Sequence, residues 1–216
     1  MEMRVLSVNV GHKQTQPKGN TLETTGIYKM AVDGPVRIGM LGIQEDFICD
    51  QKSHGGPDQA IYVYGAPDYE WWSRQLGREL APGTFGENLT LSNFESALYN
   101  IGDRLQIGSV VLEFTAPRTP CSTLARRMGD PTFVKQYRWG ERPGMYCRVI
   151  QEGILQAGDR AVLTPYAGPT VSGLDLFRAH YQSNKDAGML RRILQAPLAF
   201  RAREEVEEDL AKLMIS

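Results

Sequence analysis

Short apolar runs that contain β-branched residues occupy the first two-thirds of this 216-residue chain, and glycines and prolines separate them. Short runs of this kind, bounded by turn residues, are typical of β-strands. The residues with this pattern are 4–10, 36–43, 60–64, 88–91, 104–107, 110–115, 144–150 and 160–163. Eight short strands with few long connections favour a closed or nearly closed β-barrel over an open sheet.

One kind of turn occurs twice in this part of the chain. Ile101-Gly102-Asp103-Arg104 and Ala157-Gly158-Asp159-Arg160 each place glycine and aspartate just before a predicted strand. Both residue types favour tight turns, so we interpret the repeat as repeated turn chemistry and not as a repeated domain. Residues 105–110 likewise predict a tight hairpin with glycine in its turn.

Beyond about Thr170 the hydrophobic period changes to that of a helix. Three apolar faces follow one another: Leu174, Phe177 and Tyr181; Met189, Ile193 and Ala196; and Val206, Leu210 and Leu213, the last opposite an acidic side. Residues 164–169 contain two prolines and a glycine, which discourage continuation of a strand or helix. We therefore predict a mainly β domain with some helix over residues 1–165 and a three-helix extension over residues 170–216. Within the first part, helical spacing is local, at residues 68–76 and 124–128.

Composition narrows the classes of partner. The formal charge of -1, with 42% hydrophobic and 23% charged residues, is ordinary for a globular protein and argues against a nucleic acid polymer or a membrane surface as partner. No apolar run approaches the roughly 20 residues that span a bilayer. Three sparse cysteines and the absence of a leader-like beginning predict a reducing, cytoplasmic setting.

Cys121 is the cysteine most suited to chemistry. Pro117 and Pro120 end the preceding predicted strand, which places the thiol in a loop at the mouth of the barrel. Arg118, and a helix beginning near Ser122, would both lower the pKa of the thiol. By contrast, Cys147 alternates with apolar residues in a predicted strand, so we expect it to be a small buried hydrophobe, and we expect the same of Cys49.

Two glycine-rich segments combine flexible backbone with polar side chains. They are Ser53-His54-Gly55-Gly56-Pro57-Asp58 and Pro82-Gly83-Thr84-Phe85-Gly86-Glu87-Asn88. Glycine lets backbone amides approach a ligand closely, although either segment alone also fits an ordinary turn. Paired zinc ligands at short spacing and the glycine motifs of nucleotide triphosphatases and pyridine-nucleotide dehydrogenases are absent from the sequence, which argues against these classes.

Together, three strings resemble the MOSC domain family, named for the C-terminal domain of molybdenum cofactor sulfurases. They are His54-Gly55-Gly56-Pro57-Asp58-Gln59-Ala60, Gly83-Thr84-Phe85-Gly86-Glu87-Asn88-Leu89 and Pro117-Arg118-Thr119-Pro120-Cys121, in the family's order and approximate spacing. One departure is Gln59, where many members have lysine. The resemblance covers roughly residues 5–163, and the helical tail is similar to that of the stand-alone bacterial members called YiiM. It implies a pyruvate-kinase-like β-barrel.

The resemblance also implies a cofactor and a reaction. Cys121 would ligate the metal of the molybdenum cofactor (molybdopterin), and Gly55, Gly56, Thr84, Asn88, Arg118 and Thr119 would bind the rest of it. A pocket acid, His54, Asp58 or Glu87, would supply a proton. YiiM-type relatives reduce N-hydroxylated compounds such as 6-N-hydroxylaminopurine to amines, a detoxification, and a separate flavoprotein reductase would donate the electrons.

Two other functions stay open at this point. One is a sulfur-carrier module in which Cys121 bears a persulfide, because a low thiolate pKa serves that role equally well. The other is a non-catalytic module that binds molybdopterin or another anionic small molecule. Molybdenum and pterin in the purified protein would separate the reductase from the sulfur carrier, and ligand retention without turnover would identify the binding module. A homo-oligomer is compatible with all three.

Overall fold

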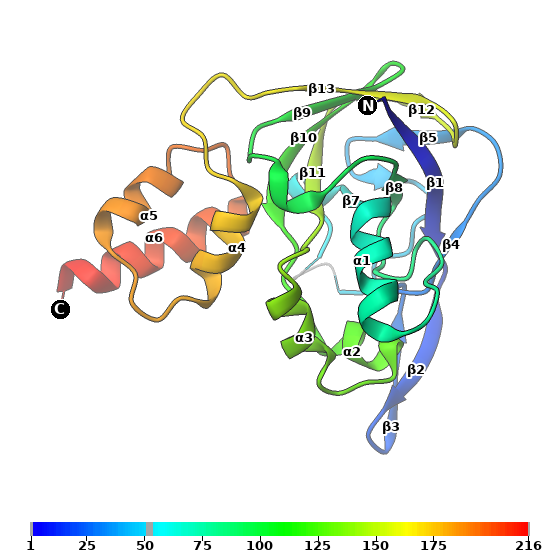
Figure 1. Ribbon diagram of the computed structural model, residues 1–216, viewed down its shortest axis with the longest axis horizontal. Coiled ribbons are helices and arrows are strands. Elements are labelled where there is room, and N and C mark those ends of the chain that lie inside the picture. The colour runs from blue at the N-terminus through cyan, green and yellow to red at the C-terminus, as the bar shows by residue number, and fades with distance from the viewer. Residues whose placement is uncertain (1, 51–53, 216) are drawn as a thin grey trace.

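Seven strands close into a β-barrel in the computed structural model, which describes residues 2–50 and 54–215 (Figure 1). Their order is β13-β9-β10-β11-β7-β8-β1, and β1 pairs with β13 to complete the ring. These strands are β1 (Met3–Gly11), β7 (Ile61–Gly65), β8 (Leu89–Leu91), β9 (Arg104–Ile107), β10 (Val110–Pro117), β11 (Met145–Gln151) and β13 (Arg160–Thr164). The neighbours are antiparallel except β7 and β8, which run parallel. The predicted closed barrel is confirmed.

The remaining strands lie outside the ring. β4 (Lys29–Ala31) adds to β1, β2 (Gln14–Lys18) and β3 (Thr21–Thr25) form a separate hairpin, and β5 (Val36–Gly39), β6 (Gly42–Ile43) and β12 (Gly153–Leu155) form a small sheet. The prediction of a single barrel strand over residues 36–43 is therefore wrong. The chain turns between β5 and β6, where Gly42 has φ +103° and a Cβ would lie 2.2 Å from the carbonyl oxygen of Ala60.

Both repeated turns have the same geometry. The Asn100 N–H donates to Oδ2 of Asp103, and the Gln156 N–H donates to Oδ2 of Asp159, each at 2.9 Å. The turns introduce β9 and β13, which pair with each other. The interpretation as repeated turn chemistry is confirmed.

Alternation along the strands produces two cores. Ile61 and Val63 of β7 point into the barrel, while Tyr62 and Tyr64 point outward into a second, aromatic core. That second core is covered by α1 (Ala66–Leu76), α2 (Ser122–Met128) and α3 (Phe133–Gly140). Two short 3₁₀ turns, η1 (Pro57–Gln59) and η2 (Ser96–Leu98), complete this part.

Three helices follow the barrel, as the sequence predicts: α4 (Gly173–Tyr181), α5 (Ala187–Ile193) and α6 (Phe200–Ile215). They lie to one side of the barrel in Figure 1. Leu176, Leu190, Ile193 and Val206 nevertheless belong to the same hydrophobic cluster as the barrel interior. The division into residues 1–165 and 170–216 stays a proposal. No helix in the described part of the chain is both long and apolar enough to cross a lipid bilayer.

Candidate functional site

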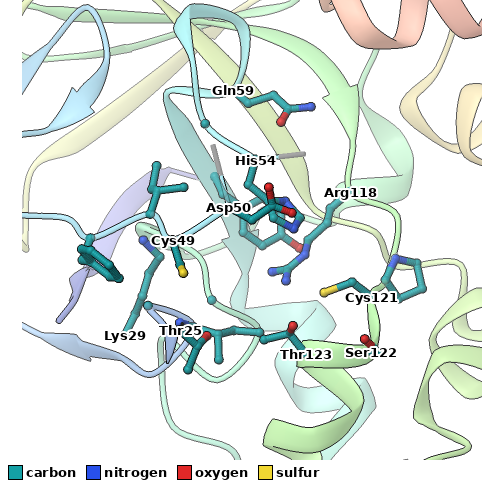
Figure 2. Close-up of a pocket in the computed structure, with 18 of the residues that line it drawn as sticks. Thr25, Lys29, Cys49, Asp50, His54, Gln59, Arg118, Cys121, Ser122 and Thr123 are labelled. Atoms are coloured by element: carbon teal, nitrogen blue, oxygen red, sulfur yellow. Dashed lines mark hydrogen bonds between the residues drawn. The ribbon is translucent and has the colours of Figure 1, made fainter. Parts of the chain in front are cut away.

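A cavity of about 580 Å³ lies where the three glycine- and proline-rich segments meet. In the view of Figure 2, Cys121 lies on one side, Lys29 and Cys49 lie on the other, and Arg118 lies between them. The predicted site residues that line it are His54, Gly55, Asn88, Arg118, Thr119 and Cys121. The strands β2 and β3 and the residues that follow β6 supply much of the rest: Lys18, Glu23, Thr24, Thr25, Gly26, Phe47, Ile48, Cys49 and Asp50.

The wall of this cavity is the outer face of the barrel. Tyr62 of β7 and Tyr146 of β11 line it, whereas their strand neighbours Ile61 and Cys147 are buried in the barrel interior. Because successive side chains of a strand point to opposite faces, the cavity cannot open into that interior at this point. The sequence placed Cys121 at the barrel's mouth; the structure places it beside the outer wall.

Cys121 is the residue just before α2, and its thiol is held as a thiolate. Burial alone would raise its pKa. A hydrogen bond from His54, the charge of Arg118 and the N–H of Leu124 in the first turn of α2 outweigh burial and lower the pKa from 9.0 to about 6. At neutral pH the thiol is therefore mostly ionised, which makes it a nucleophile and a soft ligand.

Two consecutive glycines follow His54, and each has a backbone conformation that other residues rarely adopt. Gly55 has φ +71°, and Gly56 has φ +81° with ψ 176°, a region reserved almost entirely for glycine. This reversal leads the chain from His54 into η1. The imidazole of His54 has Tyr146 as its other neighbour, with Nδ1 3.4 Å from the hydroxyl oxygen.

Arg118 is a buried cation, only 5% exposed. One Nη donates to the carbonyl oxygen of Phe85, and the guanidinium lies over the ring of Tyr62, 5.1 Å from its centre. Its Nε is buried without a hydrogen-bond partner among the described residues. A buried N–H group without a hydrogen-bond partner is costly. The unpaired Nε therefore indicates that a ligand supplies the acceptor.

A second buried cation faces the cavity from β4. Lys29 forms an ion pair with Asp46, which also accepts from Nδ2 of Asn88 at 2.9 Å and from the N–H of Gly11 at 2.8 Å. Burial lowers the pKa of Lys29, and Asp46 opposes that effect. Sequence reasoning missed Lys29 and Asp46, because both are single polar residues outside any glycine-rich segment.

Comparison with known proteins agrees with this geometry. The family model of the MOSC domain matches residues 50–162, which include the His54 segment, Asn88, Arg118 and Cys121. The chain belongs to the MOSC domain family. The protein YflK of Bacillus subtilis is 32% identical over 190 residues, covering 88% of this chain and 86% of YflK.

Two further relatives are informative. A protein of Gibberella moniliformis called "Reductase" is 30% identical over 198 residues, which are 90% of this chain and 35% of the fungal protein. The crystal structure of YiiM from Geobacillus stearothermophilus superposes with a TM-score of 0.79 at 28% identity, over 96% of this chain and 99% of that one. The MOSC barrel and the C-terminal helices therefore share one fold with YiiM.

Four predicted site residues of the MOSC segments do not line the cavity. Glu87 is fully buried and accepts from the hydroxyl groups of Tyr69 and Thr90 and the N–H of Gly83. Thr84 bonds the carbonyl oxygen of Ala81 in its own turn. The other two, Gly56 and Asp58, lie at η1. These four residues make contacts or turns within the motif segments themselves. Their roles in binding a ligand stay predictions.

The three cysteines differ in environment. Cys147 is buried in the barrel, as expected, and burial raises its pKa well above the ordinary value. The expectation for Cys49 is wrong, since this residue is exposed and lines the same cavity as Cys121. Its apolar neighbours Phe47 and Ile48 suggested burial, but residues 44–50 form a loop.

The residues present fit a molybdenum cofactor. The Cys121 thiolate is a soft ligand of the kind that suits such a metal, and the free Nε of Arg118 suits an anionic group. Nowhere in residues 2–50 and 54–215 do three His, Cys, Asp or Glu side chains converge to hold a metal ion. A metal at Cys121 would therefore take most of its ligands from a cofactor, and the cavity volume is typical of cofactor sites.

Proposed function

We propose that this protein is a molybdenum-cofactor-dependent reductase that converts N-hydroxylated compounds, such as 6-N-hydroxylaminopurine, to the corresponding amines. The observation that supports this most is the Cys121 thiolate in one cavity with the unpaired Nε of Arg118. The fungal relative called "Reductase" and the similarity to YiiM add to it.

In this proposal Cys121 would hold the metal and Arg118 would offset the negative charge of the cofactor, with the Lys29–Asp46 ion pair on the opposite side of the cavity. When bound, the cofactor would supply the redox chemistry of R–NHOH + 2 e⁻ + 2 H⁺ → R–NH₂ + H₂O. Asn88 already binds the Tyr62 N–H and the Asp46 carboxylate, so it is held rigidly at the wall. Gly55 and Thr119, which also line the cavity, would bind the cofactor beside the thiol.

The proton donor we propose is His54. Of the three acids considered, it is the one whose side chain lines the cavity, because Glu87 is fully buried away from it and Asp58 is engaged at η1. His54 would donate its ring proton to the hydroxyl oxygen that leaves as water. A separate flavoprotein reductase would supply the electrons.

The test is the metal and pterin content of protein expressed in cells that make molybdopterin. Wild type should contain both at near-stoichiometric amounts, and Cys121→Ala should lose the metal. Cys49→Ala is the matched control, because Cys49 lines the same cavity on the side away from Cys121. Loaded wild type should then reduce N-hydroxylated substrates, and Cys121→Ser should not.

Three other results would each count against the reductase. Labile sulfur on Cys121 without molybdenum or pterin would favour the sulfur-carrier function, which the low pKa of Cys121 also suits. Bound molybdopterin without turnover would leave the non-catalytic binding module. Folded protein with none of these would refute the reductase.

A further inference from the structure

We propose that helix α6 is part of the functional site, and that Arg201 is a positioning residue that holds the His54 segment in place. The inference goes beyond the proposed function, because it applies to any chemistry at Cys121. It also gives Asp58 a role: anchoring α6 to the barrel. Neither residue would touch the substrate.

Arg201 reaches from the first turn of α6 to both ends of the short segment after His54. Its Nη1 donates to the carbonyl oxygen of Gly55 at 3.0 Å and to Oε1 of Gln59 at 2.9 Å. Gly55 is the direct neighbour of His54, and both Gly55 and Gln59 line the cavity. One guanidinium therefore clamps the turn that aims the imidazole, from a helix more than 140 positions away in sequence.

Asp58 fixes the beginning of α6 to the same segment. Its Oδ2 accepts from the N–H of Phe200 at 2.7 Å, where a free N–H and the positive end of the helix favour a carboxylate. Its Oδ1 forms an ion pair with Arg148 of β11 at 3.0 Å, and Arg148 donates to the carbonyl oxygen of Leu198 at 2.9 Å.

Strand β10 also contacts both η1 and the residues just before α6. The hydroxyl of Thr115 donates to the carbonyl oxygen of Asp58 at 2.6 Å, and the carbonyl oxygen of Thr115 accepts from the N–H of Ala199 at 2.9 Å. The residues just before α6 are thus bonded to the strand that leads to Cys121. Since η1 and α6 share these partners, a movement of α6 would be transmitted to η1.

The clamp matters because the His54 segment has little rigidity of its own. Two adjacent glycines have the largest conformational freedom to lose on ordering. Arg201 bonds the carbonyl oxygen of Gly55, the first of these glycines, and the side chain of Gln59, the last residue of η1. Without Arg201, residues 54–60 should open more often, and His54 should lose its fixed position between Cys121 and Tyr146.

The experiment compares hydrogen exchange of the peptide covering residues 54–60 in the purified 216-residue chain and its Arg201→Ala variant. We expect exchange to accelerate on the order of tenfold in that peptide, since hydrogen bonds from a charged donor are lost. Arg201→Lys should restore part of the protection. Arg203→Ala is the control: Arg203 lies on the same helix but bonds the carbonyl oxygens of Leu194 and Ala196.

A second readout follows the imidazole itself. The chain has three histidines, so the ring ¹H–¹⁵N signals of His54 can be assigned with a His54→Gln variant. They should broaden or shift in Arg201→Ala and stay unchanged in Arg203→Ala. Equal exchange and equal His54 signals in wild type and Arg201→Ala would overturn the proposal. If Arg201→Ala does not fold, Gln59→Ala, which removes one of the two acceptors, must show the same local change for the proposal to stand.

Discussion

Replacing His54 with alanine should raise the pKa of Cys121. Burial pushes that pKa upward, and the hydrogen bond from His54 is the largest of the effects that lower it to about 6. Arg118 and the Leu124 N–H remain in the variant, so we expect an intermediate value, at least about one unit higher than in wild type and below 9.0.

The size of the effect decides which quantity to measure. At pH 7 a pKa of about 6 leaves roughly 90% of the thiol ionised, and a pKa of 9.0 leaves roughly 1%. Thiolates become less nucleophilic as their pKa falls, with a slope of about 0.4–0.5, so a difference of roughly three units lowers intrinsic reactivity by roughly 15- to 30-fold. Rates at one pH would therefore differ only a few-fold, whereas the titration midpoint moves by the full shift.

The assay is the rate of iodoacetamide alkylation of Cys121 between about pH 4 and pH 10, measured by intact mass. Protein from cells that lack molybdopterin keeps the thiol free. A Cys49→Ser background removes the exposed second thiol, and Cys147 is fully buried with a raised pKa, so it should not react. Global stability of each variant is checked by urea unfolding.

A wild-type midpoint at pH 8 or above, or an unchanged midpoint in His54→Ala, would refute our account of the site. The same pKa has a consequence for stability. Because the folded pKa lies below the unfolded value, the thiolate contributes stability that is fully present above pH 9.0 and is lost as the pH falls through about 6. That part of the pH dependence should vanish in Cys121→Ala.

Three further variants test the surroundings of the cavity. Glu87→Ala should lower the free energy of unfolding by about 3 kcal/mol or more, since it leaves three buried donors unpaired. Glu87→Gln should lower it by only about 1 kcal/mol. Equal losses for the two variants in urea titrations would contradict this. Arg118→Lys keeps the charge but loses the planar guanidinium over Tyr62, so the amount of bound pterin should fall about tenfold. Arg127 does not line the cavity, so Arg127→Lys should keep the wild-type amount of bound pterin. Gly86→Ala, with φ +76° and a Cβ 3.1 Å from Nη1 of Arg118, should lose more stability than Gly77→Ala, whose φ is +63° with open space around it, and should lower pterin content as well.

The barrel is predictable because its strands are short runs with β-branched residues, bounded by recognisable turns. Gly102 and Gly158 introduce β9 and β13 where the sequence predicts them. The hairpin of β2 and β3 escaped prediction because residues 14–25 are almost entirely polar, so they carry no hydrophobic period. The Gly19-Asn20 dipeptide, a common turn signal, could have indicated it.

Motifs indicated which segments meet at the cavity, but not which side chains face it. Glu87 and Asn88 are adjacent, and one is enclosed in the protein while the other lines the cavity. Their direction depends on how the chain enters β8, which depends in turn on pairing with β7 and β1. Asp58 is likewise engaged by Arg148 of β11 and by the N–H of Phe200, and the second contact exists only once α6 has docked.

In each motif segment, some residues thus line the cavity, and others make contacts within the protein that fix the position of the segment. The two motif carboxylates, Asp58 and Glu87, are both used for holding. The motif side chains at the cavity wall include a buried cation, a thiolate, an imidazole and an amide, from Arg118, Cys121, His54 and Asn88. Such a wall favours an anionic ligand beside the thiolate, because Arg118 has no carboxylate partner among the described ion pairs. It also leaves His54 as the motif residue able to deliver a proton there, which is why the clamp on its backbone is the feature we would test first.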